Sequence, residues 1–136
     1  MERYATVTKE RERTALGVGV GTHLLCELWE CDRELLNSRR YLVQVLRQAV
    51  KACGGTLLGI KSHAFKPYGV TAIALLAESH ISIHTWPELG YAAVDVFTCG
   101  RTMDPYRATE LLREALRARR EQLLEVRRGP GVTPDG

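Results

Sequence analysis

Residues 78–100 read ESHISIHTWPELGYAAVDVFTCG, and this stretch decides the architecture around it. Its runs 81–86 and 91–98 are rich in the β-branched, aromatic and apolar residues that favour strands. The four residues between them, Pro87-Glu88-Leu89-Gly90, are typical of a tight turn. The stretch therefore predicts an antiparallel hairpin.

The predicted hairpin also has a predicted register. If Trp86 and Tyr91 flank the turn, Ser79 pairs with Thr98 and neighbours Cys99. A hydroxyl and a thiol that are twenty residues apart in the chain then meet at one corner of a sheet.

Strand-like runs and amphipathic helices follow one another along the rest of the chain. Asp32 is a candidate helix N-cap, and apolar residues recur behind it at three- and four-residue spacing until Gly54-Gly55 ends the helix. Asp104-Pro105 marks a second helix start, with proline at the first helical position. The expected strands are residues 23–29, 56–60, 70–77, 81–86, 91–98 and 122–126, and the expected helices begin at residues 33 and 105.

This order predicts an α+β fold, a two-layer α/β sandwich in which two helices cover one face of a largely antiparallel sheet. The other face then lacks a cover within the chain. A second copy is the simplest cover, so we expect a homodimer whose two sheets stack. We expect residues 1–16 to be a flexible leader, residues 17–127 a single domain, and residues 128–136 a flexible tail.

Composition favours one cytoplasmic domain and excludes several partners. The chain has 136 residues and a formal net charge of +3, which suits a single core and gives little attraction to a polyanion. The late arginines lack interleaved aromatic residues, so we expect no nucleic-acid partner. No apolar run approaches 20 residues, so we expect no membrane partner. The four cysteines form no Cys-x-x-Cys pair and predict reduced thiols in the cytoplasm.

The segment from Glu78 to Gly100 resembles the self-cleavage and active-site region of the short prokaryotic S-adenosylmethionine decarboxylases. Residues 23–32 and 65–70 fall where that family has its other signature segments, so the resemblance covers roughly residues 20–127. It implies that the bond between Glu78 and Ser79 breaks autocatalytically and that Ser79 becomes a covalent pyruvoyl cofactor. The products would be a β chain, residues 1–78, and an α chain, residues 79–136.

A serine at a tight bend can carry out such a cleavage. Attack of the Ser79 hydroxyl on the preceding carbonyl converts the amide into an ester, provided that donors stabilise the oxyanion and a base moves the proton. Elimination from the ester leaves dehydroalanine, and hydrolysis of its imine tautomer leaves the pyruvoyl group. The ketone of that group forms a Schiff base with an amine and withdraws electrons, as pyridoxal phosphate does in other decarboxylases.

The resemblance also implies roles for five further residues. His84 matches the residue that transfers protons during processing, and Thr71 stands where a serine hydroxyl usually helps to hold the cleavage intermediate. Cys99 matches the acid that protonates the substrate carbon after carbon dioxide has left. Phe65 matches the aromatic residue that stacks on the substrate adenine, and Glu88 matches the carboxylate that binds the ribose hydroxyls.

The sequence leaves the substrate pocket open at two positions, Phe65 and Leu28. From the sequence alone, Phe65 could equally pack in the core beside Pro67 and Tyr68. The chain departs from the family at Leu28, where an aromatic residue next to the glutamate is expected.

Hairpin geometry separates the serine from the histidine. A strand advances about 3.3 Å per residue, so His84 lies roughly 16 Å from Ser79 along one straight strand. Two subunits whose sheets cross near a two-fold axis could join them, and the family builds its site across such a dimer.

Other polar residues have competing interpretations. His23, Cys26 and Cys31 could suggest a zinc site, but strand alternation puts His23 and Cys26 on opposite faces, and we expect no bound metal. Asp95 is either a buried, paired carboxylate near the site or a residue at a solvated sheet edge. We interpret His80 as an exposed turn histidine.

Three functions remain open. The first is decarboxylation of S-adenosylmethionine, which supplies aminopropyl groups for spermidine and polyamine biosynthesis. The second is a pyruvoyl-dependent arginine or ornithine decarboxylase on the same scaffold, with Glu27, Glu30 or Asp95 at the end of the pocket. The third is a non-catalytic binding homologue, which the intact set of catalytic residues argues against. Phe65 and Glu88 suit an adenosyl group and favour the first.

Overall fold

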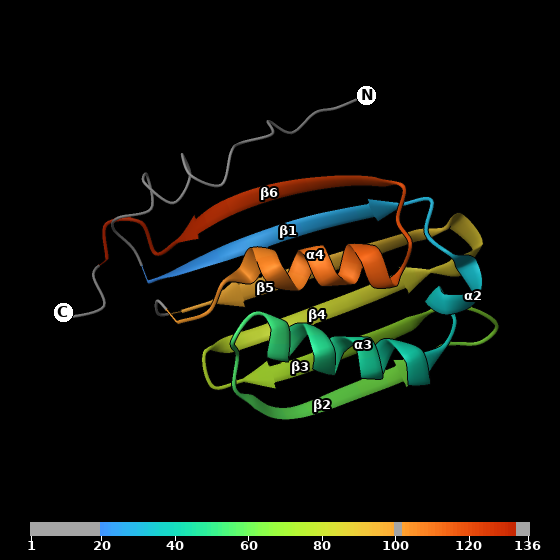
Figure 1. Ribbon diagram of the computed structural model, residues 1–136, viewed down its shortest axis with the longest axis horizontal. Coiled ribbons are helices and arrows are strands. Elements are labelled where there is room, and N and C mark those ends of the chain that lie inside the picture. The colour runs from blue at the N-terminus through green and yellow to red at the C-terminus, as the bar shows by residue number, and fades with distance from the viewer. Residues whose placement is uncertain (1–19, 100–101, 133–136) are drawn as a thin grey trace.

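A six-stranded antiparallel sheet forms one layer of the molecule, and helices form the other (Figure 1). The computed structural model describes residues 20–99 and 102–132, so the predicted leader lies outside the described residues. The strand order is β2-β3-β4-β5-β1-β6. The elements are β1 (Gly21–Trp29), α2 (Arg33–Leu36), α3 (Arg39–Ala52), β2 (Leu57–Ala64), β3 (Val70–Leu76), β4 (Ser79–Trp86), the 3-10 turn η1 (Pro87–Leu89), β5 (Tyr91–Thr98), α4 (Pro105–Ala115) and β6 (Arg120–Arg128).

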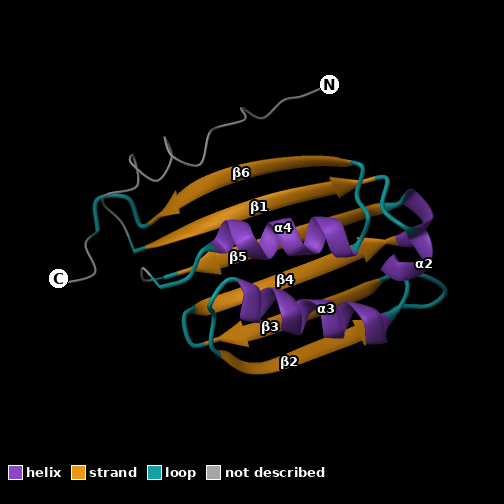
Figure 2. Cartoon of the chain, viewed as in Figure 1, coloured by secondary structure: helices purple, strands orange, loops and turns teal. Residues whose placement is uncertain are grey.

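The two longer helices, α3 and α4, lie side by side on one face of the sheet, which confirms the predicted α+β sandwich (Figure 2). Leucines of both helices meet the sheet residues that alternate toward them, and each such side chain contributes roughly 1.5–3 kcal/mol by leaving water. The largest fully buried side chains include Leu24, Leu28, Leu42, Leu46, Ile81, Ile83, Val94, Val96, Leu112 and Leu116.

The β4–β5 hairpin has the predicted register. Trp86 pairs with Tyr91 beside the turn, and Ser79 pairs with Thr98 at the other end. Gly90 closes the turn with a φ of 64°, a left-handed conformation that glycine adopts without steric cost.

The prediction of one helix from residue 33 is wrong in one respect, because the structure has two helices there, α2 and α3. Asp32 caps α2 as expected, accepting the Leu35 N–H at 3.1 Å. The chain then breaks at Asn37 and Ser38, where the Ser38 hydroxyl accepts the Tyr41 N–H at 3.2 Å and starts α3. A side chain that bonds the local backbone competes with helix continuation and ends α2.

The second sheet face carries no helix in the described part of the chain, and we call it the open face. Large apolar side chains stand exposed there, with Ile73 42% and Leu75 57% accessible. No described helix is both long and apolar enough to cross a membrane. By strand alternation the open face includes Thr71, Ile73, Leu75, His80, Ser82, His84, Trp86, Tyr91, Asp95 and Phe97.

Candidate active site

The peptide bond before Ser79 lies at the bend between β3 and β4, next to the end of β5. The carbonyl of Glu78 accepts a hydrogen bond from the backbone N–H of Cys99 at 3.1 Å. A donor in this position orients the carbonyl and polarises it toward attack. The structure therefore brings together Glu78, Ser79 and Cys99 at one corner, and a serine that follows a polarised carbonyl fits conversion into a pyruvoyl group.

Only one of the four cysteines, Cys99, is not fully buried. Burial raises the pKa of the Cys31 thiol to about 11, and burial also raises the pKa of Cys26 and of Cys53. These three thiols are buried and therefore protonated and inert. Cys99 is half-buried and directly follows the strand that pairs with Ser79.

Thr71 and His84 form a second cluster, on the open face. They pair across β3 and β4, and the Thr71 hydroxyl lies 3.0 Å from Nδ1 of His84. His84 lies five positions after Ser79 along β4, which corresponds to roughly 16 Å. One protomer thus joins the two predicted processing residues to each other but not to the serine.

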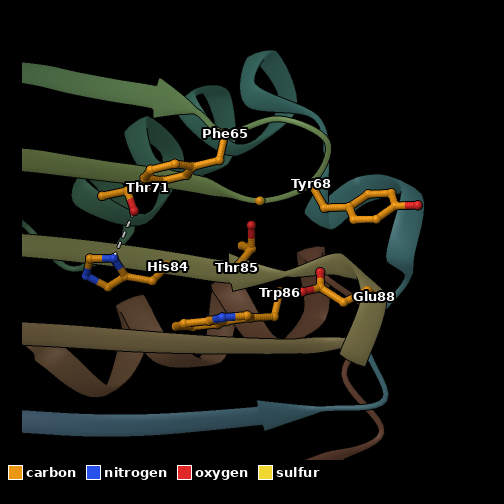
Figure 3. A pocket seen from close by; sticks show the side chains of 8 residues that line it. Phe65, Tyr68, Thr71, His84, Thr85, Trp86 and Glu88 are labelled. Atoms are coloured by element: carbon orange, nitrogen blue, oxygen red, sulfur yellow. Dashed lines mark hydrogen bonds between the residues drawn. The ribbon is translucent and has the colours of Figure 1, made fainter.

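A cavity of about 330 Å³ opens beside the Thr71–His84 pair (Figure 3). Figure 3 shows the rings of Phe65 and Trp86 on either side of the space, with His84 and Glu88 toward its two ends. Two aromatic faces and a carboxylate in one cavity suit a flat ring joined to a polyhydroxyl group. The lining residues are Phe65, Tyr68, Gly69, Thr71, His84, Thr85, Trp86 and Glu88.

The aromatic residues of this cavity differ in part from the expectation. Phe65 is 52% exposed and lies outside the core, so the packing alternative is wrong. Leu28 is fully buried beneath the helices and cannot face the cavity. Sequence reasoning missed Trp86, although alternation along β4 puts it on the same face as His84.

His80 lies within β4 and is half-buried, so the interpretation as an exposed turn residue is wrong. Its Nδ1 atom is 3.5 Å from the Ser79 hydroxyl oxygen. Burial lowers the pKa of His80, the neighbouring His23 lowers it further, and Asp95 opposes both effects. A lowered pKa keeps the His80 imidazole neutral near pH 7, beside the serine.

Asp95 is a paired carboxylate on the open face rather than a solvated edge residue. One oxygen of Asp95 lies 3.1 Å from Nε2 of His23, and the other accepts a hydrogen bond from the Ser82 hydroxyl at 3.1 Å. Arg128 can only donate, and its guanidinium lies 3.1 Å from Nδ1 of His23, so Nε2 is the ring nitrogen that can donate to Asp95. Cys26 faces the core, and the described residues contain no cluster of three metal-ligating side chains.

Comparison with known proteins places the chain among decarboxylases. The family model described as S-adenosylmethionine decarboxylase matches residues 22–129. An S-adenosylmethionine decarboxylase proenzyme of Methanococcus aeolicus is 46% identical over 113 residues, 83% of this chain and 97% of that protein. The proenzyme of Thermotoga maritima is 46% identical over 110 residues, 81% of this chain and 85% of that protein. The crystal structure of an adenosylmethionine decarboxylase from Aquifex aeolicus matches with a TM-score of 0.78 at 37% identity, covering 83% of this chain and 93% of that one.

Proposed function

Because this chain belongs to the S-adenosylmethionine decarboxylase family, we propose that it decarboxylates S-adenosylmethionine with a pyruvoyl group made from Ser79. Enzymes of this family carry a covalently bound pyruvoyl group that forms from a serine by autocatalytic cleavage. The ketone of this group binds the substrate amine and withdraws electrons from the carbon that loses carbon dioxide. The decarboxylated product supplies aminopropyl groups for spermidine synthesis.

The observation that carries the proposal is the hydrogen bond from the Cys99 N–H to the Glu78 carbonyl. When the Ser79 hydroxyl attacks this carbonyl, negative charge develops on the oxygen that the N–H already contacts. The new C–O bond replaces the C–N bond, and the hydroxyl proton moves to the released amine. In the resulting ester the leaving group is the backbone carboxylate of Glu78. Its elimination from the former Ser79 side chain cleaves the chain.

Three side chains have proposed proton-transfer or holding roles. The hydrogen bond to Thr71 occupies Nδ1 of His84, so Nε2 is the nitrogen that can move protons during cleavage. Thr71 orients this ring and supplies the hydroxyl for the cleavage intermediate. The accessible thiol of Cys99 donates the proton to the substrate carbon in each turnover.

The cavity beside the Thr71–His84 pair is proposed as the adenosyl subsite. Its volume of about 330 Å³ is at the small end of ligand sites, and a partner surface over the open face would complete it. Phe65 and Trp86 can contact the two faces of adenine, so Trp86 takes the place of the aromatic residue that Leu28 cannot supply. The Glu88 carboxylate can accept hydrogen bonds from the ribose hydroxyls.

Substrate identity is tested by release of labelled carbon dioxide from S-adenosylmethionine, arginine and ornithine. We expect S-adenosylmethionine to be the fastest substrate and Phe65→Ala to lower its kcat/KM by roughly 5- to 150-fold, because stacking on a base contributes about 1–3 kcal/mol. Cleavage should be unchanged in this variant. Leu58→Ala, which removes another exposed apolar side chain that does not line the cavity, is the control. Faster release from arginine or ornithine would overturn the substrate and leave the cleavage chemistry intact.

A homodimer is proposed because one protomer holds the two halves of the site apart. Ser79 and Cys99 lie at one end of the β4–β5 hairpin, while Glu88 and the Thr71–His84 pair lie toward the other. The exposed apolar side chains of the open face support a second copy as its cover. Two-fold stacking with crossed strands would place Ser79 of one protomer near His84 of the other.

Co-expression of Ser79→Ala and Glu88→Ala chains tests this arrangement. If the site is shared, each heterodimer contains one intact site, so a statistical mixture should regain about a quarter of wild-type activity. Each variant alone should stay near zero. No recovery in heterodimers that are verified by two affinity tags would show that Ser79 and Glu88 act within one subunit.

We place the enzyme in the cytoplasm. The four cysteines are unpaired in the structure, and free thiols of this kind persist in reducing compartments. S-adenosylmethionine, the proposed substrate, would then have to be present in the same compartment.

A further inference from the structure

Glu78 is tied to the rest of the protein by its side chain as well as by its carbonyl. One carboxylate oxygen accepts the backbone N–H of Thr56 at 3.0 Å, and the other accepts the Thr56 hydroxyl, also at 3.0 Å. The N–H of Ala77 donates to the Thr56 carbonyl at 3.0 Å. Three hydrogen bonds therefore connect the bend before Ser79 to this one threonine.

Thr56 is itself held by the helix layer. It directly follows Gly54 and Gly55, which end the α3 region, and the Gly55 N–H donates to the Val50 carbonyl at 2.9 Å. Gly54 has a φ of 82°, a conformation that favours glycine. A Cβ on Gly55 would approach side-chain atoms of Val50 and Leu76 within 3.4 Å, so this connection is closely packed. The threonine thus directly follows a closely packed connection to α3.

This contact is expected to contribute only modestly to the free energy of unfolding. Thr56 is exposed, and hydrogen bonds and ion pairs at exposed sites add little to the free energy of unfolding. Hydrogen bonding from the Thr56 backbone N–H is the main cause that lowers the pKa of Glu78, so its carboxylate is ionised near pH 7 and can accept both bonds.

We propose that Thr56 is a positioning residue for self-cleavage. Its two hydrogen bonds to the Glu78 carboxylate keep the Glu78 carbonyl in contact with the Cys99 N–H. The inference deepens the proposed function and depends on it. In the step concerned, the Ser79 oxygen bonds to the Glu78 carbonyl carbon and the C–N bond of the same carbon breaks. Restricting rotation at Glu78 raises the fraction of chains in which this carbon faces the oxygen and its own oxygen faces the donor.

The first test measures the cleavage rate of newly synthesised full-length chains, followed on denaturing gels after cell-free translation. Thr56→Val keeps the backbone N–H and the shape but removes the hydroxyl, and we expect it to slow cleavage about threefold to tenfold. Thr56→Ser restores a hydroxyl and should restore most of the rate. The melting temperature should be the same for all three proteins, which excludes a general loss of folding.

A double-mutant cycle identifies the partner of the hydroxyl. In a Glu78→Ala background the carboxylate is missing, so adding Thr56→Val should slow cleavage no further. Equal rates for wild type and Thr56→Val, or independent effects of the two substitutions, would overturn the positioning role while self-cleavage itself still stands. A wild-type chain that never cleaves would overturn both this role and the proposed function.

Discussion

A Ser79→Ala protein is expected to remain one chain and to release no carbon dioxide from S-adenosylmethionine. The substitution removes the hydroxyl that is proposed to attack the polarised Glu78 carbonyl, so neither the ester nor the ketone should form. Wild-type protein should give two chains, residues 1–78 and 79–136, by intact mass. Its 79–136 chain should resist amino-terminal sequencing because a ketone replaces the amine.

The matched control for this experiment is Ser62→Ala. Ser62 lies in β2, and its hydroxyl accepts a hydrogen bond from Arg39 at 2.8 Å rather than facing the bend. This variant should cleave and turn over like the wild type. Carbon dioxide release by an uncleaved protein, whether wild type or Ser79→Ala, would contradict the pyruvoyl mechanism.

The second large effect is expected at Cys99. Cys99→Ala keeps the backbone N–H that contacts Glu78, so cleavage should continue. It removes the proposed proton donor, and the loss of such an acid typically lowers a rate by about 10²- to 10⁴-fold. Turnover per cleaved chain should fall by this amount, and protonation at the wrong atom should leave a sequenceable amino terminus on the 79–136 chain.

Two comparisons separate this effect from a general disturbance. Cys31→Ala removes a buried thiol that lies outside the proposed machinery, and it should retain both cleavage and turnover. His84→Ala should give the opposite pattern to Cys99→Ala, with slow cleavage as its main defect. Wild-type turnover per cleaved chain in Cys99→Ala would remove the thiol from the mechanism.

Local signals made the hairpin and the helix starts after Asp32 and Asp104 predictable, whereas the start of α3 after Ser38 was not predicted. The turn between Trp86 and Tyr91 sets the pairing of every residue along both strands. The predicted pairing of Ser79 with Thr98 is therefore confirmed. The caps at Asp32 and Asp104 depend on contacts within three residues. Such interactions join residues that are close in the sequence, so they can be predicted without knowing where distant segments lie.

Contacts between distant segments were not predictable in the same way. The Thr56–Glu78 and His23–Asp95 contacts join residues 22 and 72 positions apart. Neither pair belongs to a repeating pattern, so composition and spacing give no signal for it. Trp86 was overlooked for a related reason: its place in the cavity depends on the loop that carries Phe65 and Tyr68, not on β4 alone.

The sequence by itself determined the candidate reactive groups and the register that brings Ser79 beside Cys99, because a hairpin turn and a two-residue strand period are local properties. Tertiary structure decided which of the two sheet faces is covered and which residues of neighbouring strands meet on the open one. The packing of α3 and α4 on one side of the sheet buries Leu28 and leaves His84, Trp86 and Asp95 on the other. The strand order decided the rest, since it puts Thr71 opposite His84 and Thr56 within reach of Glu78. These placements depend on the burial of apolar area by the whole chain, which no short segment encodes.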